Sequence, residues 1–330
     1  MKKLTKIGVS ALAGSLAAVA AQAGELSVSG SAVLSYTSED VKNQATGNAF
    51  GMKNNISFSG SGDVNGYEVT YFNALSDTAG VSSSSLTIDM GDMGSFKFDQ
   101  GTGGNGLDAY DDKLPYAYEE ASDGMTGQIS YAGDESTNTL VYKNTVAGFA
   151  LNVAYDPSTG DADTADGAFS GAGVTGSSRS IAVGLPTIVD GLDAGVAMGE
   201  DEIANGTTTA TDMESILAFA NYSMGPITVG YQMAETSGGA AGSNMTAMEG
   251  MGVIFNVNEN LSVSYTSYDQ EYKKTGGNAD VTEESSALAA AYTMGSATLV
   301  IQQNEQDNAG GSTAATADEE RTEINLSLAF

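Results

Sequence analysis

The side chains that could carry chemistry in this chain are almost all carboxylates. His and Cys are both absent, which removes the commonest metal ligand, the usual general base and the most reactive nucleophile. Two segments concentrate the acids: Asp161, Asp163 and Asp166 in one, and Asp108, Asp111, Asp112, Glu119 and Glu120 in the other. Clustered carboxylates could bind Ca²⁺, but the spacing matches no EF-hand loop, and solvated acidic loops are commoner. The sequence predicts no enzyme, no certain metal site and no cofactor beyond a structural calcium ion.

The first 23 residues have the three-part pattern of a secretory signal peptide. A basic start with three lysines precedes an apolar run over 7–20, and Ala21-Gln22-Ala23 forms a small-x-small cleavage site. The apolar run is too short and too rich in Ala, Gly and Ser to span a bilayer comfortably. We therefore expect residues 1–23 to be removed and residues 24–330 to form one domain.

The mature chain is strongly acidic. Without the three lysines of the leader, nine basic residues face 42 acidic ones, a net charge of −33. Such a surface repels nucleic acid, and no basic patch suggests a nucleic-acid site. The absence of Cys means that an exported chain of this kind holds together without disulfides.

Strict alternation of apolar and polar residues recurs along the whole mature chain, which is typical of β-strands. In the first such segment Leu26, Val28 and Leu34 share one face, whereas Ser27 and Ser29 lie on the other. Later segments repeat this pattern as far as the C-terminus. The second face is expected to be almost wholly Ser, Thr, Asn, Asp, Glu and Gln.

The connections between these segments alternate in length. Short turns such as 62–66 and 258–260 separate pairs of strands, and long polar loops are predicted at 38–50, 75–83, 101–137, 156–177, 200–212, 235–247, 269–284 and 305–319. Short turns at one end and long loops at the other are the anatomy of a transmembrane barrel. About 16 strands result if 101–137 is one long loop. Ile129 and Tyr131 could make a seventeenth strand, but single-chain bacterial barrels have even counts.

A soluble barrel of this size would have to fill its interior with hydrogen-bonded polar side chains. In a wide membrane barrel the polar face meets water, and lipid covers the apolar face. Closure satisfies every backbone hydrogen bond within the membrane. The sequence therefore predicts an all-β, transmembrane, antiparallel barrel of 16 strands.

The chain resembles the general-diffusion porins of Gram-negative bacteria, particularly the alphaproteobacterial type. The resemblance is carried by the leader, the rhythm of strands and loops, the long third loop, and the segment 140–144 followed by a short turn into 149–155. The terminal Phe330, preceded by alternating Leu328, Leu326 and Ile324, is similar to the signal that the barrel-assembly machinery reads in this family.

The resemblance implies a homotrimer in the outer-membrane lipid whose third long loop folds into the lumen and narrows the pore. In this chain that loop is 101–137, and its acids Asp108, Asp111, Asp112, Glu119 and Glu120 would form an acidic wall of the constriction. The alternative is a solvated acidic surface loop. Strand parity places Lys53, Lys97, Lys143 and Arg321 on the lumen face, where they would form the opposing wall. The family often carries an arginine cluster there, so these scattered lysines predict a weaker transverse field.

The predicted function is passive diffusion of small hydrophilic solutes and ions, with a preference for cations because acidic residues greatly outnumber basic ones. A substrate-specific channel is one alternative, although neither an aromatic slide nor a basic ladder is evident. A non-transporting structural or adhesive barrel is the other, since the long loops would face outward.

Overall fold

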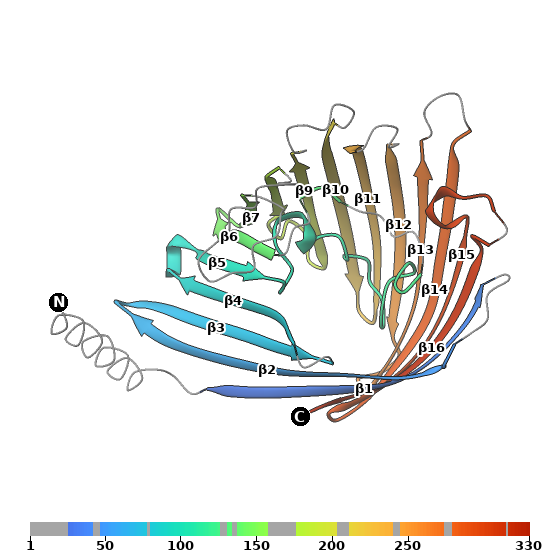
Figure 1. Ribbon diagram of the computed structural model, residues 1–330, viewed down its shortest axis with the longest axis horizontal. Coiled ribbons are helices and arrows are strands. Elements are labelled where there is room, and N and C mark those ends of the chain that lie inside the picture. Colours follow the sequence, from blue (N-terminus) through green and yellow to red (C-terminus); the bar gives the residue numbers. More distant parts are fainter. Residues whose placement is uncertain are drawn as a thin grey trace, which may run out of the picture.

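The protein is described by a computed structural model over residues 26–41, 47–77, 80–125, 131–133, 137–157, 176–202, 211–239, 245–273, 279–314 and 316–330. Sixteen strands in these ranges form one closed antiparallel barrel (Figure 1). The strands are β1 (Ser27–Val41), β2 (Phe50–Val64), β3 (Tyr67–Ser76), β4 (Val81–Asp89), β5 (Ser95–Gln100), β6 (Thr137–Val146), β7 (Phe149–Asp156), β8 (Ser178–Gly184), β9 (Leu192–Asp201), β10 (Thr211–Met224), β11 (Ile227–Gly239), β12 (Thr246–Asn256), β13 (Leu261–Tyr272), β14 (Val281–Met294), β15 (Ala297–Asp307) and β16 (Glu319–Ala329).

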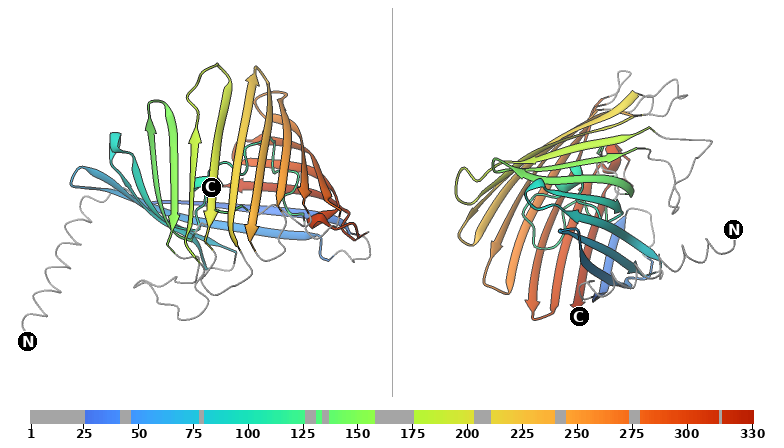
Figure 2. Two further views of the ribbon diagram at one scale, coloured as in Figure 1. Left: turned by 90° about the horizontal axis from the view of Figure 1, so that it is seen from above. Right: turned by 90° about the vertical axis from the view of Figure 1, so that its left-hand side faces the viewer.

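Each strand pairs with its neighbours in the sequence, and β1 closes the ring by pairing with β16. Further views show the strands inclined across the wall of the barrel (Figure 2). The described residues also form three 3₁₀ turns, η1 (Gly91–Met93), η2 (Gly106–Ala109) and η3 (Ala309–Gly311). None of the helices in the described ranges is long and apolar enough to cross a bilayer. The predicted 16-stranded, all-β barrel is confirmed.

Alternation along each strand sorts side chains between the outer face and the lumen. On β10, Ile216 is 55% exposed on the outside, whereas Leu217 on the inside is 1% exposed. Leu288, Met251 and Met198 are likewise exposed on the outer face. An exposed apolar band around a closed barrel is the surface that lipid covers.

The short turns lie together at one end of the barrel and need unusual backbone conformations. Asn65 and Gly66 join β2 to β3 with φ values of 56° and 88°. Two positive φ angles give the turn a twist that matches the flanking strands, and Asn-Gly is the preferred pair for such a turn. Ala147 and Gly148 repeat this pattern between β6 and β7.

At the opposite end several strands continue further than the sequence predicted. β11 runs to Gly239, β13 to Tyr272, and β14 begins at Val281, so the predicted loops 235–247 and 269–284 are shorter than expected. These strand ends carry polar residues on both faces. The alternation therefore disappears from the sequence while the backbone pairing continues.

The seventeenth strand considered from the sequence is not needed to close the barrel. Residues 126–130 lie outside the described ranges, and Tyr131 lies in no strand but is buried inside the barrel. The sixteen strands form an unbroken ring without this segment.

The C-terminal residue seals the barrel against Gly30 of β1. The backbone N–H of Phe330 donates to the Gly30 carbonyl at 2.9 Å, and the Gly30 N–H donates to the Phe330 carbonyl at 2.8 Å. The Phe330 ring lies directly over Gly30, where an added Cβ would come within 2.9 Å of the ring. A larger residue at this position would have to displace the Phe330 ring.

Gly30→Val should displace the Phe330 ring and weaken the contact between β1 and β16. Overpacking of this kind costs about 1–3 kcal/mol. Urea unfolding of the barrel in detergent micelles would measure the loss. Gly60→Val is the matched control because a Cβ at Gly60 of β2 meets its nearest atom at an ordinary 3.8 Å. Equal stability of the two variants would contradict this account of closure.

Candidate functional site

The segment between β5 and β6, residues 101–136, lies inside the barrel and is called loop L3 below. Of L3, residues 101–125 and 131–133 are described. Its apolar residues join one buried cluster with the inner face of the wall. The cluster contains Leu107, Leu114, Ala121 and Tyr131 of L3, and Ala182, Ala197, Leu217, Ala234, Met248, Tyr268 and Ala287 of the wall.

Each strand from β8 to β14 thus contributes one inward residue to this cluster, and all but Tyr268 are wholly apolar. The expectation of an almost wholly polar inner face is therefore wrong for this half of the barrel. Phe219 is a further example, because its ring meets that of Tyr110 edge to face at 4.9 Å. The inner face is apolar where a second layer of protein, rather than water, covers it.

Glycines on the same strands make room for L3. An added Cβ at Gly195 would lie 2.6 Å from the Tyr110 ring, and one at Gly252 would lie 3.1 Å from Pro115. The loop therefore packs against the bare backbone of the wall. Small residues at these inward positions are required by that close approach.

The backbone of L3 is hydrogen-bonded by polar side chains of the wall. These bonds use Asn152 of β7, Ser180 of β8, Ser215 and Asn221 of β10, Gln232 of β11, Ser264 of β13, and Gln302 and Asn304 of β15. Gln232 is fully buried, and its amide both accepts from the Lys113 N–H at 3.2 Å and donates to the Tyr110 carbonyl at 3.3 Å. These amides and hydroxyls replace the partners that a strand would find in a sheet.

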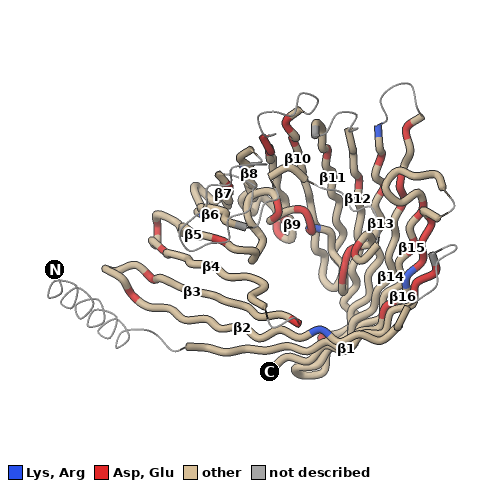
Figure 3. The backbone as a smooth tube through the Cα atoms, in the orientation of Figure 1, with Lys and Arg blue, Asp and Glu red and all other residues tan. Residues whose placement is uncertain are grey.

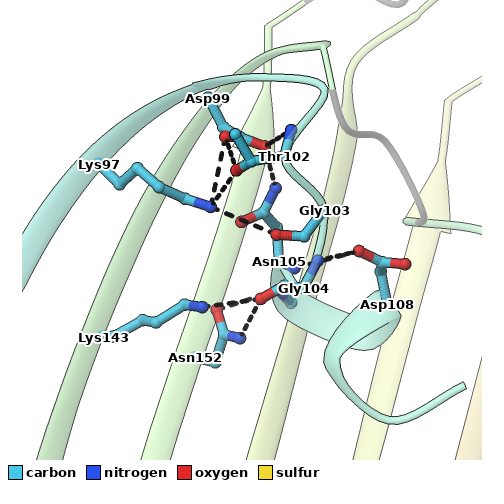
Figure 4. A network of polar contacts seen from close by, with 10 residues as sticks. Lys97, Asp99, Thr102, Gly103, Gly104, Asn105, Asp108, Lys143 and Asn152 are labelled. Carbon is cyan, nitrogen blue, oxygen red and sulfur yellow. Dashed lines mark hydrogen bonds and ion pairs between the residues drawn. The ribbon is translucent and has the colours of Figure 1, made fainter. Parts of the chain in front are cut away.

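The start of L3 is organised by Asp99, which is fully buried at the end of β5 (Figure 4). Its carboxylate accepts from the Thr102 N–H at 3.2 Å and from the Asn105 amide at 2.7 Å. The ammonium of Lys97 lies 3.3 Å from the same carboxylate and donates to the Gly103 carbonyl. Lys97 therefore points into the barrel as predicted, but its charge is held within this network.

Lys143 of β6 completes the same network. Its ammonium donates to the Gly104 carbonyl at 2.8 Å, and the Asn152 amide donates to the same carbonyl at 3.0 Å (Figure 4). Asp108 accepts from the backbone N–H groups of Gly104 and Asn105 and so caps the short helix η2. The structure brings Asp108 close to Lys97 and Lys143, but as parts of the loop's anchor.

Three of the other predicted acids lie further along L3, where acidic residues outnumber basic ones (Figure 3). Asp111, Asp112 and Glu120 line a cavity of about 220 Å³ between L3 and β12–β14. Glu120 is buried and accepts a 2.5 Å hydrogen bond from the Tyr268 hydroxyl. Burial, followed by the charge of the neighbouring Asp112 carboxylate, raises the pKa of Glu120 to about 9.

Glu119 faces a different direction from Glu120. Its backbone N–H is held by Gln302 at 3.3 Å, and the charge of Lys53 acts on its carboxylate. Desolvation raises the pKa of Glu119, and the Lys53 charge opposes that shift. Lys53 is exposed on the inner face of β2, opposite Val33 of β1.

Arg321 lies on the inner face of β16, as predicted, and is mostly buried. Its guanidinium lies 3.0 Å from Glu323 and 3.9 Å from Glu39. It also lies against the backbone of L3 at Gly124. Like Lys97 and Lys143, Arg321 therefore interacts with other groups of the protein.

The wall formed by β1 to β4 is not covered by L3 in the described structure. The inward residues of β1 and β2 are largely serine, and Ser29 of β1 and Ser57 of β2 share a 2.7 Å hydrogen bond between their hydroxyls. Ser29 is exposed, whereas Gln232 and Gln302 on the other side of the barrel are 0% and 2% exposed. The open part of the lumen therefore lies between L3 and this hydroxyl-lined wall.

The sequence matches the family model described as Gram-negative porin over residues 8–311. The chain belongs to the Gram-negative porin family. It forms a diffusion channel across the outer membrane, and the family consists of channels rather than enzymes, in agreement with the sequence prediction. No curated protein matches the chain closely enough to be counted as a relative.

Solved porin structures share the fold of this porin at low sequence identity. OmpF of Salmonella typhi is 15% identical with a TM-score of 0.69, covering 92% of this chain and 97% of its own. OmpT of Vibrio cholerae is 12% identical with a TM-score of 0.65 over 92% of this chain and 97% of its own. A mutant of the porin from Rh. blastica is 13% identical with a TM-score of 0.58, covering 93% of this chain and 100% of its own.

The calcium expectation for this porin rests partly on residues that the structure leaves out. Asp161, Asp163 and Asp166 lie outside the described ranges. Within those ranges, no group of three or more Asp, Glu, His or Cys residues is arranged to hold a metal ion.

Sequence reasoning missed the wall residues that hold L3, such as Gln232, Asn304 and Ser180. The sequence contains only a weak signal for these residues. Long amides and small hydroxyls on the inner face of β7–β15 contrast with the uniform serines of β1 and β2. Without knowledge of where the loop lies, both patterns are simply polar.

Gln232→Leu should loosen the middle of L3 in this porin because three loop backbone contacts lose their partner. Leaving buried backbone groups unpaired costs about 1–3 kcal/mol. Hydrogen exchange of the amides around Lys113 should accelerate accordingly. Gln303→Leu on the outer face of β15 is the control, and similar exchange in both variants would argue against the pinning role of Gln232.

Proposed function

We propose that this porin is a passive, cation-preferring pore whose narrowest part is bounded by L3 and by the wall of β1 to β4. The observation that supports this most directly is that most of the basic residues predicted for the pore wall are bonded to other groups of the protein. The lumen-facing Lys97, Lys143 and Arg321 are bonded to L3 or to carboxylates. Of the basic residues predicted for the pore wall, only Lys53 has neither an ion pair nor a side-chain hydrogen bond among the described residues.

Cation preference follows from the charges that border water. The Glu119 carboxylate of L3 interacts electrostatically with Lys53 of β2, and further acids, among them Asp63 of β2 and Glu68 of β3, share the inner face of the same wall. A pore with excess negative charge at its narrowest part concentrates cations and excludes anions. Small hydrophilic solutes would cross by diffusion. They would exchange hydrogen bonds with water for hydrogen bonds with serine hydroxyls.

The assembly and biogenesis of this porin are inferred from relatives and from the sequence. The set of similar structures includes OmpT of Vibrio cholerae in a trimer form, 11% identical with a TM-score of 0.61. We therefore propose a homotrimer in outer-membrane lipid. From the sequence we also propose that residues 1–23 are removed on export and that the barrel-assembly machinery recognises Phe330. Conductance steps in groups of three and N-terminal sequencing of the mature protein would test these points.

The selectivity proposal makes opposite predictions for two substitutions of similar size. Lys53→Gln should strengthen the preference for cations, because the opposing positive charge is removed, and Glu119→Gln should weaken it. Reversal potentials of single channels in planar bilayers under a KCl gradient would measure both. An anion-selective wild-type channel would overturn the proposal, as would shifts of the same sign in the two variants.

A further inference from the structure

The 220 Å³ cavity between L3 and the wall is lined by carboxyl groups from both sides. L3 contributes Asp111, Asp112, Glu120 and Asp123, and β14 contributes Glu283. Among the described residues that line it, none is Lys or Arg. The charge of Lys113 acts on Asp112 and lowers its pKa, but burial has the larger, opposite effect. So many carboxylates cannot all be ionised at close range without a compensating charge.

Glu120 lies at the centre of this arrangement and touches both layers. Its carboxyl group accepts from the Tyr268 hydroxyl of β13 at 2.5 Å and shares the cavity with the carboxyl of Asp112, whose charge raises the pKa of Glu120. Its backbone carbonyl accepts from Asn304 at 3.4 Å, and the next carbonyl, that of Ala121, accepts from the same amide at 2.8 Å. Two carboxyl groups can hydrogen-bond to each other only if one of them carries a proton.

We propose that Glu120 carries a proton at neutral pH and shares it with Asp112, and that this shared proton latches L3 to β13. Loss of the proton places two adjacent negative charges in a cavity whose described lining residues include no Lys or Arg. Alkaline pH therefore releases the middle of the loop from the wall and alters the pore. This inference rests on the proposed role of L3 in bounding the channel.

The direction of the pH effect follows from the surroundings of Glu120. Asp112, Asp111 and Asp123 of L3 and Glu283 of β14 face the cavity and disfavour ionisation, while Tyr116, Tyr131 and Tyr268 surround it. The pKa of Glu120 rises from 4.5 to about 9 on docking, first through burial and then through Asp112. The docked state thus binds the extra proton, so docking is fully favoured below pH 4.5 and weakens as pH rises through about 9. Between these two values the docked fraction relative to the released one falls by up to about tenfold per pH unit, and above the higher value it levels off.

Glu120→Gln is the decisive variant because glutamine keeps the size and hydrogen bonds of a neutral glutamic acid but cannot ionise. The full-length porin in lipid vesicles would be compared at pH 7, 8.5 and 10 by hydrogen exchange of L3. At each pH, the exchange rate of the L3 amides in the wild type would be divided by their rate in the variant. This division cancels the intrinsic effect of pH on exchange. The ratio should rise several-fold between pH 7 and pH 8.5 and level off by pH 10.

Glu119→Gln is the matched control, since Glu119 faces the pore side and lies next to Glu120 in the sequence. It should retain the alkaline acceleration of the wild type. A constant ratio for Glu120→Gln across this range would overturn the latch, as would the same loss of pH dependence in both variants.

Infrared spectroscopy of the wild type provides a second measurement that does not depend on the folding of a variant. A protonated carboxyl band should persist at pH 7 and disappear at alkaline pH, and its absence at pH 7 would overturn the proposal. Single-channel recordings over the same range separate the two ideas. A channel whose conductance is indifferent to a demonstrated release of L3 would refute the role of the loop in the pore while leaving the latch intact.

Discussion

The structure depends on one constraint, which is that an irregular loop inside a barrel must find partners for its own backbone. Strands satisfy each other within the wall, but L3 has no neighbouring strand. Asn152, Gln232 and Asn304 reach inward from three different strands to pair with its N–H and carbonyl groups. The apolar residues of the loop then have to be covered, and the alanines and Leu217 of the wall cover them. The position of L3 is therefore determined by the side chains of the strands that it crosses.

This constraint divides the barrel into two functional halves. The strands from β7 to β15 support the loop, and inward side chains such as that of Gln302 on β15 are buried there. Asn325 on the neighbouring strand β16 is also buried. The strands β1 and β2 carry mainly short hydroxyl side chains on their inner face, such as those of Ser29 and Ser57. Basic residues follow the same division. Lys97 and Lys143 lie at the boundary and are used to hold the loop, whereas Lys53 lies in the open half.

The architecture could be predicted from the sequence because two-residue periodicity and loop lengths are local properties. Strand number, closure by Phe330 and the inward direction of Lys97 follow from counting and parity. The site could not be predicted in the same way. Parity shows that Asp108 or Lys143 can face the lumen, but not that each is bonded within the anchor of L3. That outcome depends on the path of the loop, which is set by residues far apart in the sequence.

The path of L3 also determines which acidic residues contribute to the electric field in the pore. The excess of acidic over basic residues in the sequence is a sum over the whole molecule, whereas a permeating ion responds to charges that border its own path. Asp108 is bonded to backbone N–H groups, and Glu120 is buried with a pKa raised to about 9 by burial and by Asp112. In the latch that we propose, Glu120 holds the loop in its protonated, uncharged form. The adjacent Glu119 has other partners and interacts electrostatically with Lys53 of β2.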